Sequence, residues 1–232
     1  MARSKRRAAK PKPAAKRRDG RRIIRLDNEE RRAALLAMGQ AAFAKLPYDE
    51  VSIDELAAKA KISKGLFYYY FPTKRDLYIA GLRETSKGLT RRLTSVPRDL
   101  PPRERAGAAV DAYLDSVEQL GPAFIALMRG AIGADPRVGE VVEAVRRGIA
   151  DEFFASPVGR LLEQKPLSRI AIRGWIGMVE ASSIEWLANK TIDRVAVREL
   201  LVDQLFSVLT QVVGSAGVAK LDADRRSTTA RR

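Results

Sequence analysis

The sequence predicts an all-α protein in which a small three-helix domain is joined to a larger helical domain. Apolar residues recur at the three- and four-residue spacing of amphipathic helices along most of the 232 residues. Capping residues, prolines and glycines separate these segments where helices are expected to begin and end. Alternating apolar runs joined by turn dipeptides, which would indicate strands, are absent from the sequence.

The N-terminal 26 residues are strongly basic. Twelve Lys and Arg residues stand there against the single acid Asp19, which accounts for +11 of the total charge of +15. Such a segment buries too little apolar surface to fold alone, so we expect residues 1–26 to form a disordered arm. The arm would serve solubility, contact phosphates or place arginines in a minor groove. Residues 214–232 are expected to form a flexible tail.

The first folded helix is expected to begin near Asp27 or Asn28. Glu29 and Glu30 would then lie in its first turn, where negative charge suits the helix dipole. Its apolar stripe consists of Leu35, Met38, Ala42, Phe43 and Leu46.

Two short helices joined by a tight turn follow. Ser52 and Ser63 each stand at a helix start, and Glu55 completes a capping box with Ser52. On a helical wheel the second helix gathers a basic and aromatic face, away from Phe67 and Phe71. Such a face suits a nucleic-acid groove, although short amphipathic helix pairs also occur in proteins that bind none. The face consists of Lys64, Gly65, Tyr68 and Tyr69.

Residues 28–80 closely resemble the N-terminal domain of TetR-type transcriptional repressors. The most specific segments are residues 62–65 (Ile-Ser-Lys-Gly), 68–72 (Tyr-Tyr-Tyr-Phe-Pro) and 73–74 (Thr-Lys), followed by Leu77. The resemblance implies a helix-turn-helix DNA-binding domain over residues 27–72. Lys61 and Pro47 replace glycines that are usual in the family. Leu66 and Tyr70 replace its usual polar residue and histidine, which would change the operator rather than the fold.

The resemblance and the helical face together predict the residues that touch DNA. Lys64 and the Gly65 backbone would reach base edges, and Leu66 would meet a thymine methyl group. Most other contacts would go to phosphates, with Lys74 reaching from the start of the following helix. The predicted DNA-binding residues are Ser52, Ser63, Lys64, Gly65, Leu66, Tyr68, Tyr69 and Lys74.

Residues 73–213 are expected to form a helical effector-binding and dimerisation domain. Its first helix would run to about residue 95, span roughly 30 Å and, as in the family, link the two domains. Gly121 and Gly133 are expected to stop helices, and Asp135 to cap one. Residues 156–165 are consistent with either a loop or a short helix. The remaining helices are expected at residues 103–120, 122–132, 136–155, 168–189 and 193–213.

The last two predicted helices, at residues 168–189 and 193–213, carry more apolar residues than one partner face would cover. These residues either fill the core of the subunit or pack against a second copy. The resemblance implies a homodimer in which the two helices join their symmetry mates in a four-helix bundle. Such a dimer would present two recognition helices to a palindromic double-stranded DNA operator.

The larger domain is expected to bind a small hydrophobic or amphipathic effector, such as an acyl chain, a sterol-like ring system or a lipophilic drug. Glu180 is expected to pair with Arg173 or to be exposed, with pairing to a cationic ligand as the alternative. Arg129 would suit a carboxylate or phosphate group. The candidate ligand-binding residues are Tyr113, Phe124, Met128, Phe153, Phe154, Trp175, Met178 and Trp186.

Composition argues against enzymatic and metal chemistry. The chain has no cysteine and no histidine, which removes thiol nucleophiles, the usual zinc sites and histidine bases. We therefore expect no enzyme activity, no cofactor and no metal. No apolar run approaches the roughly 20 residues that cross a bilayer, and the N-terminus lacks a signal-peptide stretch, so we expect a cytoplasmic protein with no membrane contact.

The main interpretation is a ligand-responsive repressor that an effector releases from its operator. Two alternatives stay open. A nucleoid-type protein would bind DNA through the basic arm without sequence preference. An activator of the same family would read an operator but respond to no small molecule.

Overall fold

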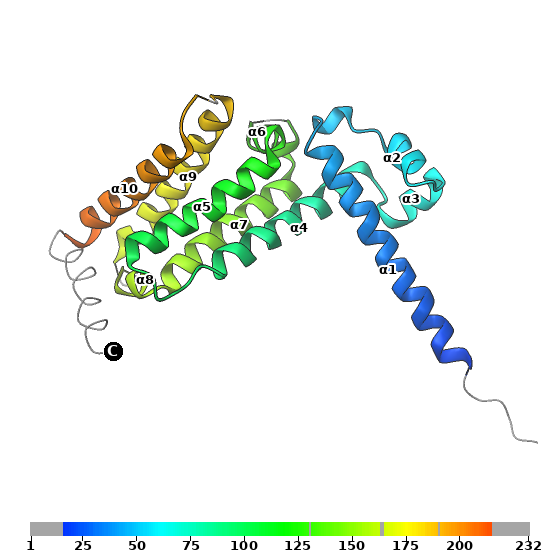
Figure 1. The fold of residues 1–232 in the computed structure, drawn as a ribbon, viewed down its shortest axis with the longest axis horizontal. Helices are drawn as coiled ribbons and strands as arrows, with labels where there is room; N and C mark the ends of the chain where they lie inside the picture. The colour runs from blue at the N-terminus through cyan, green and yellow to red at the C-terminus, as the bar shows by residue number, and fades with distance from the viewer. Residues whose placement is uncertain (1–15, 130, 163–164, 190, 215–232) are drawn as a thin grey trace, which may run out of the picture.

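The computed structural model describes the backbone of residues 16–129, 131–162, 165–189 and 191–214. Within these ranges every regular element is a helix, as the sequence predicts. Helices α1, α2 and α3 form one end of the molecule, and α4 to α10 form a bundle beside them (Figure 1). The predicted tail from residue 215 onward and residues 1–15 of the predicted arm lie outside the described residues.

Helix α1 (Lys16–Phe43) begins well before the predicted start near Asp27. The prediction of disorder is therefore wrong for residues 16–26. Arg, Lys and Leu are good helix formers, and a helix already nucleated by a folded segment gains one hydrogen bond for each residue added. Because α1 ends at Phe43, Leu46 falls outside the apolar stripe and is 43% exposed.

The three-helix domain closes around a compact core. Helix α1 is followed by the 3₁₀ turn η1 (Tyr48–Glu50), α2 (Ile53–Lys59) and α3 (Lys64–Tyr70). Leu35 and Phe43 of α1 share this core with Leu56 of α2 and with Phe67 of α3. Phe67 is fully buried, as its position on the wheel predicts, so the opposite face of α3 points outward.

The turn between α2 and α3 is built on Lys61, which has a φ of +56°. The Ile62 N–H donates to Ala57 O at 3.1 Å and the Lys61 N–H to Ala58 O at 3.0 Å, the two hydrogen bonds of a Schellman motif. This motif places its left-handed residue where glycine is usual in the family. The turn therefore keeps its geometry without glycine, at the cost of a strained lysine backbone.

Lys61→Gly is expected to raise the free energy of unfolding by about 0.5–1 kcal/mol, because relief of the left-handed strain exceeds the entropy that glycine adds to the unfolded chain. Urea unfolding followed by circular dichroism measures the change. Ala58→Gly, at an exposed residue inside α2, is the control and should lower the free energy of unfolding by about 1 kcal/mol. Equal destabilisation by both substitutions would contradict the strain at Lys61.

The larger domain starts with α4 (Lys74–Thr94), which spans about 31 Å and connects the two parts. Helices α5 (Pro102–Leu120) and α7 (Pro136–Ala155) pack against α4. Helices α9 (Pro166–Ala188) and α10 (Arg194–Val213) complete the bundle, and all four lie close to the predicted boundaries. Helix α6 (Pro122–Arg129) ends before the predicted residue 132, and the 3₁₀ turn η2 (Ala131–Ala134) contains Gly133. For residues 156–165 the sequence was consistent with a loop or a short helix. The structure has the short helix α8 (Pro157–Leu162) there.

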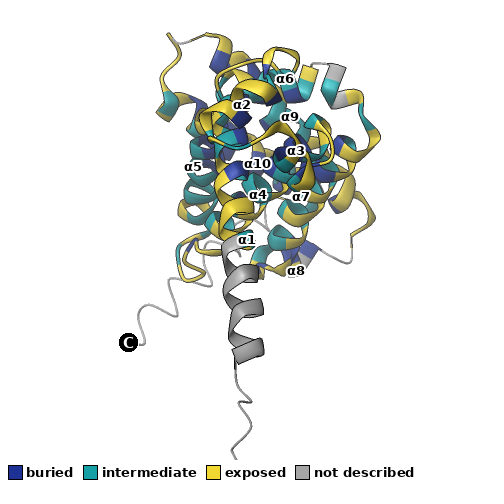
Figure 2. Cartoon of the chain, turned by 90° about the vertical axis from the view of Figure 1, so that its right-hand side faces the viewer, coloured by how far each residue is buried: buried dark blue, intermediate teal, exposed yellow. Residues whose placement is uncertain are grey.

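The two domains share a continuous core at the start of α4. Leu127 of α6 and Val138 and Val141 of α7 belong to the same buried cluster as the three-helix domain. Two ion pairs close the junction on its outside, Arg75 to Asp135 and Arg137 to Asp76, each at 2.9 Å. Figure 2 views the molecule from the three-helix end, with buried residues gathered between the helices.

Candidate nucleic-acid interface and effector pocket

The outer face of α3 is the most exposed aromatic surface among the described residues. Tyr69 is 72% exposed and Tyr68 is 37% exposed, while Lys64 and Gly65 are also exposed and Leu66 is half-buried. Buried Phe67 and Phe71 hold the helix from behind. The structure therefore brings the predicted base-contacting and aromatic residues of α3 to one accessible face.

Both predicted cap serines hold the starts of their helices. The Ser52 hydroxyl accepts from the Glu55 N–H at 3.4 Å, and the Ser63 hydroxyl accepts from the Leu66 N–H at 3.1 Å. Each hydroxyl keeps its own O–H as a donor, so capping is compatible with the predicted phosphate contacts.

Lys64 lies against Asp54 of α2, with its Nζ 2.8 Å from a carboxylate oxygen. This hydrogen bond raises the pKa of Lys64 above its usual value. The pair is exposed, and exposed pairs contribute little to stability, so phosphates or base edges can compete for the ammonium group. Asp54 therefore orients Lys64 on the face that would approach DNA.

Lys74 is engaged within the domain, which the sequence did not reveal. Its Nζ donates to the carbonyl oxygens of Asp49 at 3.2 Å and Val51 at 3.1 Å, and stands 4.7 Å from the ring centre of Tyr48. An ammonium group has three donors, so one N–H is left for a phosphate. The first role of Lys74 in this structure is to tie the loop before α2 to α4.

Lys74→Met is expected to lower the free energy of unfolding by about 1–2 kcal/mol, because two carbonyl groups lose a charged donor while the apolar stem is kept. Urea unfolding measures this loss. Lys59→Met, at an exposed lysine of α2, is the matched control and should change stability little. Unchanged stability combined with a salt slope of DNA binding lowered by about one would instead assign Lys74 to phosphate contact alone.

Tyr70 also has a structural partner. Its hydroxyl donates to Asn28 Oδ1 at 3.0 Å, and its ring meets that of Tyr69 edge-on at a centroid distance of 5.2 Å. The residue that replaces the family's usual histidine thus joins α3 to α1 and supports Tyr69 from the side.

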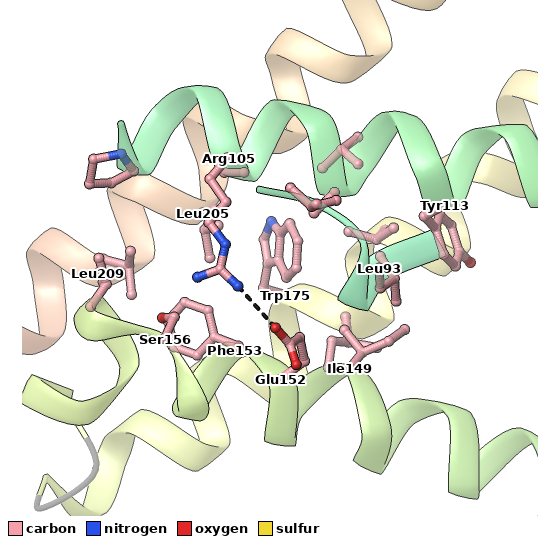
Figure 3. Close-up of a pocket in the computed structure, with 18 of the residues that line it drawn as sticks. Leu93, Arg105, Tyr113, Ile149, Glu152, Phe153, Ser156, Trp175, Leu205 and Leu209 are labelled. Atoms are coloured by element: carbon pink, nitrogen blue, oxygen red, sulfur yellow. Dashed lines mark hydrogen bonds and ion pairs between the residues drawn. The ribbon is translucent and has the colours of Figure 1, made fainter. Parts of the chain in front are cut away.

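A cavity of about 140 Å³ lies inside the larger domain, between α5, α7, α9 and α10. Most of its wall is apolar. Figure 3 shows Trp175 inside it, Leu205 and Leu209 on one side, and Tyr113 at the far end. This volume and lining suit the apolar part of a small molecule.

The predicted pocket residues divide into three groups. Tyr113, Phe153 and Trp175 line this cavity, and Phe124 and Met128 line a second one of about 80 Å³ nearer to α6. Phe154 is buried beneath Arg169 and faces a surface groove instead. Trp186 and Met178 line neither cavity. Trp186 donates to Ile192 O at 3.2 Å in the turn before α10, and Met178 packs in the helical core. The structure therefore places these last three residues outside both cavities.

Two charged pairs in the pocket region were not predicted. Arg105 of α5 meets Glu152 of α7 at 2.9 Å, with side chains only 15% and 21% exposed (Figure 3). Both residues line the larger cavity. In the sequence, Arg105 and Glu152 are simply a basic and an acidic residue on amphipathic helices. Charged residues on such helices usually lie on the solvent-exposed face, so the sequence did not single out this pair.

Glu180 lies between the two cavities and pairs with Arg146. Arg146 Nε and Nη2 donate to its two carboxylate oxygens at 2.8 and 2.9 Å. Arg173 pairs with Glu143 instead, so the expected partner of Glu180 is wrong. Arg129 pairs with exposed Glu185 and lines neither cavity, which removes it as an anion site in the pocket.

An apolar strip runs over the outer faces of α9 and α10. Leu167 and Ile170 are 65% and 70% exposed, and Leu200 is 51% exposed. A Cβ added at Gly174 or Gly177 would meet nothing within 4 Å. The other apolar side chains of these helices mostly fill the subunit's own core, among them Ile172, Ile176, Val179, Leu201, Val202 and Leu205.

The described part of the chain contains no group of three acidic residues arranged to hold a metal ion. Among the same residues, no helix combines the length and the apolar character needed to span a bilayer.

Comparison with known proteins identifies both parts of the chain. Residues 35–80 match the model of bacterial regulatory proteins of the tetR family, and residues 102–208 match a tetracyclin repressor-like C-terminal domain. A TetR-family transcriptional regulator from Streptomyces coelicolor superposes with a TM-score of 0.67 at 32% identity, over 87% of this chain and 89% of that one.

Two curated relatives are also transcriptional regulators. The activator FasR of Mycolicibacterium smegmatis is 28% identical over 66% of this chain and 69% of its own. The regulator EthR of the same organism is 30% identical over 101 residues, which is 46% of its length. With an exposed recognition helix and a matching helical domain, this chain belongs to the TetR family of DNA-binding transcriptional regulators.

Proposed function

We propose that the protein is a homodimeric repressor that leaves a palindromic operator when a hydrophobic or amphipathic small molecule binds its larger domain. The observation that supports this most is the connection between the two sites. The exposed face of α3 belongs to a domain whose core continues through α4 and α7, and α7 carries Ile149, Glu152 and Phe153 in the wall of the larger cavity. Reading chromosomal DNA implies a cytoplasmic location.

In the DNA-bound state, the two α3 helices of a dimer would enter successive major grooves. Lys64 and the Gly65 backbone would meet base edges, and Leu66 a thymine methyl group. Phosphates would be contacted mainly by Tyr68 and Tyr69, with the Ser52, Ser63 and Lys74 donors that stay available after their intramolecular hydrogen bonds.

Release from the operator would follow from a displacement of α7. Its cavity residues lie in the C-terminal half, while its first turn is tied to α4 through the pair of Arg137 and Asp76, and Asp135 before it is tied to Arg75. An effector that binds better when α7 is displaced would shift the population toward a state in which the α3 helices no longer match the grooves.

The dimer would form through the apolar strip of α9 and α10. Glycines at positions 174 and 177 would let the backbone of a partner helix come close to α9, and Ile170 and Leu200 would lose their exposure to water. Burial of such side chains is favourable by about 1.5–3 kcal/mol each, so their replacement by charged residues should weaken the dimer strongly.

Ile170→Arg combined with Leu200→Arg is expected to convert the dimer to a monomer at micromolar concentration, because two charges would enter an apolar interface. Sedimentation equilibrium measures the mass. Leu46→Arg, at an exposed leucine of the three-helix domain, is the matched control and should leave the dimer intact. A double variant that is still dimeric would place the interface elsewhere.

Selection of bound genomic fragments by the purified protein tests the function directly. The full chain, a chain without residues 1–15 and a chain without residues 1–26 are compared. We expect one palindromic motif in all three, with a lower affinity and a smaller salt slope as arm charges are removed. Loss of all enrichment on truncation would instead indicate a nucleoid-type protein that binds through its arm.

An activator is the second candidate, because the relative FasR is named as one. A reporter gene placed behind the selected operator distinguishes the two. A repressor lowers transcription and is relieved by its effector, whereas an activator raises transcription from the same operator.

A further inference from the structure

An acidic residue stands directly beside the lysine that is proposed to meet base edges. The Lys64 ammonium nitrogen lies 2.8 Å from one carboxylate oxygen of Asp54 and 3.0 Å from the other. Asp54 belongs to the first turn of α2 and Lys64 to the first turn of α3, and these helices lie side by side at one end of the molecule (Figure 1). This helix pair therefore exposes a donor and an acceptor next to each other.

The stability of the domain gives little reason for an acid at position 54. The Asp54 and Lys64 side chains are 64% and 56% exposed, and such exposed pairs contribute little to folding. The start of α2 is already capped by the Ser52 hydroxyl, and Glu55 places a second negative charge in its first turn. A carboxylate beside a DNA-contacting lysine also repels the phosphates. Asp54 therefore weakens DNA binding in general while helix α2 gains little from it.

A G·C base pair presents the complementary arrangement in the major groove. Guanine offers O6 and N7 as acceptors, and the cytosine paired with it offers its N4 amino group as a donor. O6 and N4 are joined by a Watson–Crick hydrogen bond, so they lie about 2.9 Å apart. The Lys64 nitrogen lies 2.8 and 3.0 Å from the two Asp54 oxygens. The ion pair and the edge of the base pair therefore match in both polarity and spacing.

Both side chains can meet the base pair without breaking their own ion pair. An ammonium group has three donors, so one can stay on Asp54 while the other two reach O6 and N7 of guanine. A carboxylate has about four acceptor sites and can take the N4–H of cytosine in addition to Lys64. If the base pair is reversed to C·G, the ammonium group faces the amino group and the carboxylate faces O6. Both contacts then become repulsive.

We propose that Asp54 and Lys64 together read one base pair in each half-site, with Lys64 donating to guanine and Asp54 accepting from the cytosine paired with it. This inference rests on the proposed operator contact of Lys64 and adds a specificity-determining residue from outside α3. T·A should bind next best, because thymine O4 and adenine N6 keep the central acceptor and donor while a methyl group replaces N7. A·T and C·G invert the order of acceptor and donor and should be rejected.

Affinities of the full-length protein for variants of its selected operator test the proposal. Each position of the half-site is replaced symmetrically by the other three base pairs, and binding is measured by fluorescence anisotropy at one fixed salt concentration. One position should prefer G·C, with A·T and C·G each weaker by about tenfold or more. In Asp54→Asn this discrimination should fall below about threefold, because an amide group both donates and accepts. Preferences at the other positions should stay unchanged.

Glu55→Gln is the matched control for Asp54→Asn. It removes one negative charge from the neighbouring residue of the same turn and keeps a side chain that suits a capping box. Both variants should bind random-sequence DNA more tightly than the original protein, by a similar factor, because each reduces the repulsion from phosphates. Thermal unfolding establishes that both variants fold. Equal changes of sequence preference in the two variants would assign the effect to charge alone and overturn the proposal.

Lys64→Ala separates this inference from the contact on which it rests. Relaxation of the same position by Lys64→Ala and by Asp54→Asn would support joint reading by the pair. Relaxation by Lys64→Ala alone would mean that Lys64 reads its base without Asp54, which overturns the proposal and leaves the lysine contact intact. If Lys64→Ala changes no preference, the proposed lysine contact fails as well, while a palindromic operator read by other residues of α3 would still stand.

Discussion

Arg146→Met is expected to lower the free energy of unfolding by about 2–4 kcal/mol, because it leaves the Glu180 carboxylate buried without its cationic partner. The arginine supplies both hydrogen bonds to the Glu180 carboxylate, which is 14% exposed. Removal of the cation leaves that charge between two apolar cavities with no compensating donor. Urea unfolding of the purified protein measures the loss.

Two further variants show whether the cost comes from the isolated charge. Arg146→Met combined with Glu180→Met removes both charges and should recover stability to within about 1 kcal/mol of the original protein. Arg173→Met breaks the exposed pair with Glu143 and should cost less than about 1 kcal/mol. Equal losses for Arg146→Met and Arg173→Met would show that the Glu180 pair is not a buried one in solution.

Gly39→Val is expected to destabilise the DNA-binding domain by about 2–3 kcal/mol and to abolish operator binding at physiological temperature. A Cβ at position 39 would stand 2.8 Å from Cδ1 of Leu77, and Leu77 is fully buried. Because Leu77 has no free space to move into, α1 and α4 would have to separate. This separation would disturb the core that Leu77 shares with Phe67 of α3.

Gly88→Val is the matched control for this substitution. Gly88 also lies inside a helix, but a Cβ there would meet nothing within 4 Å. Its stability should change by less than about 0.5 kcal/mol, because valine and glycine differ little in helix propensity. Similar losses at both positions would attribute the effect at Gly39 to valine in a helix rather than to the contact with Leu77.

The sequence by itself determined the helical fold and most of the ends of the helices. Ser52, Ser63 and Asp135 cap the helices at which they were predicted, because a cap hydrogen bond joins residues only two or three apart. The burial of Phe67 and the exposure of Tyr69 follow from helical periodicity in the same way. Local composition misled most at residues 16–26, where α1 continues in the N-terminal direction.

Tertiary structure alone decided which partners the long charged side chains take. Lys74 reaches carbonyl groups more than 20 residues away, and Glu180 pairs with Arg146 rather than Arg173. Several opposite charges lie within reach of such side chains on any helical face, so spacing cannot choose among them.

The cavities were also decided by the tertiary structure. Trp175 lines one and Trp186 does not, although both are aromatic residues on the same helix. A core residue and a cavity residue have the same apolar character in the sequence. Whether a space is left beside them depends on how the volumes of side chains from several helices fit together, and no single segment contains that information.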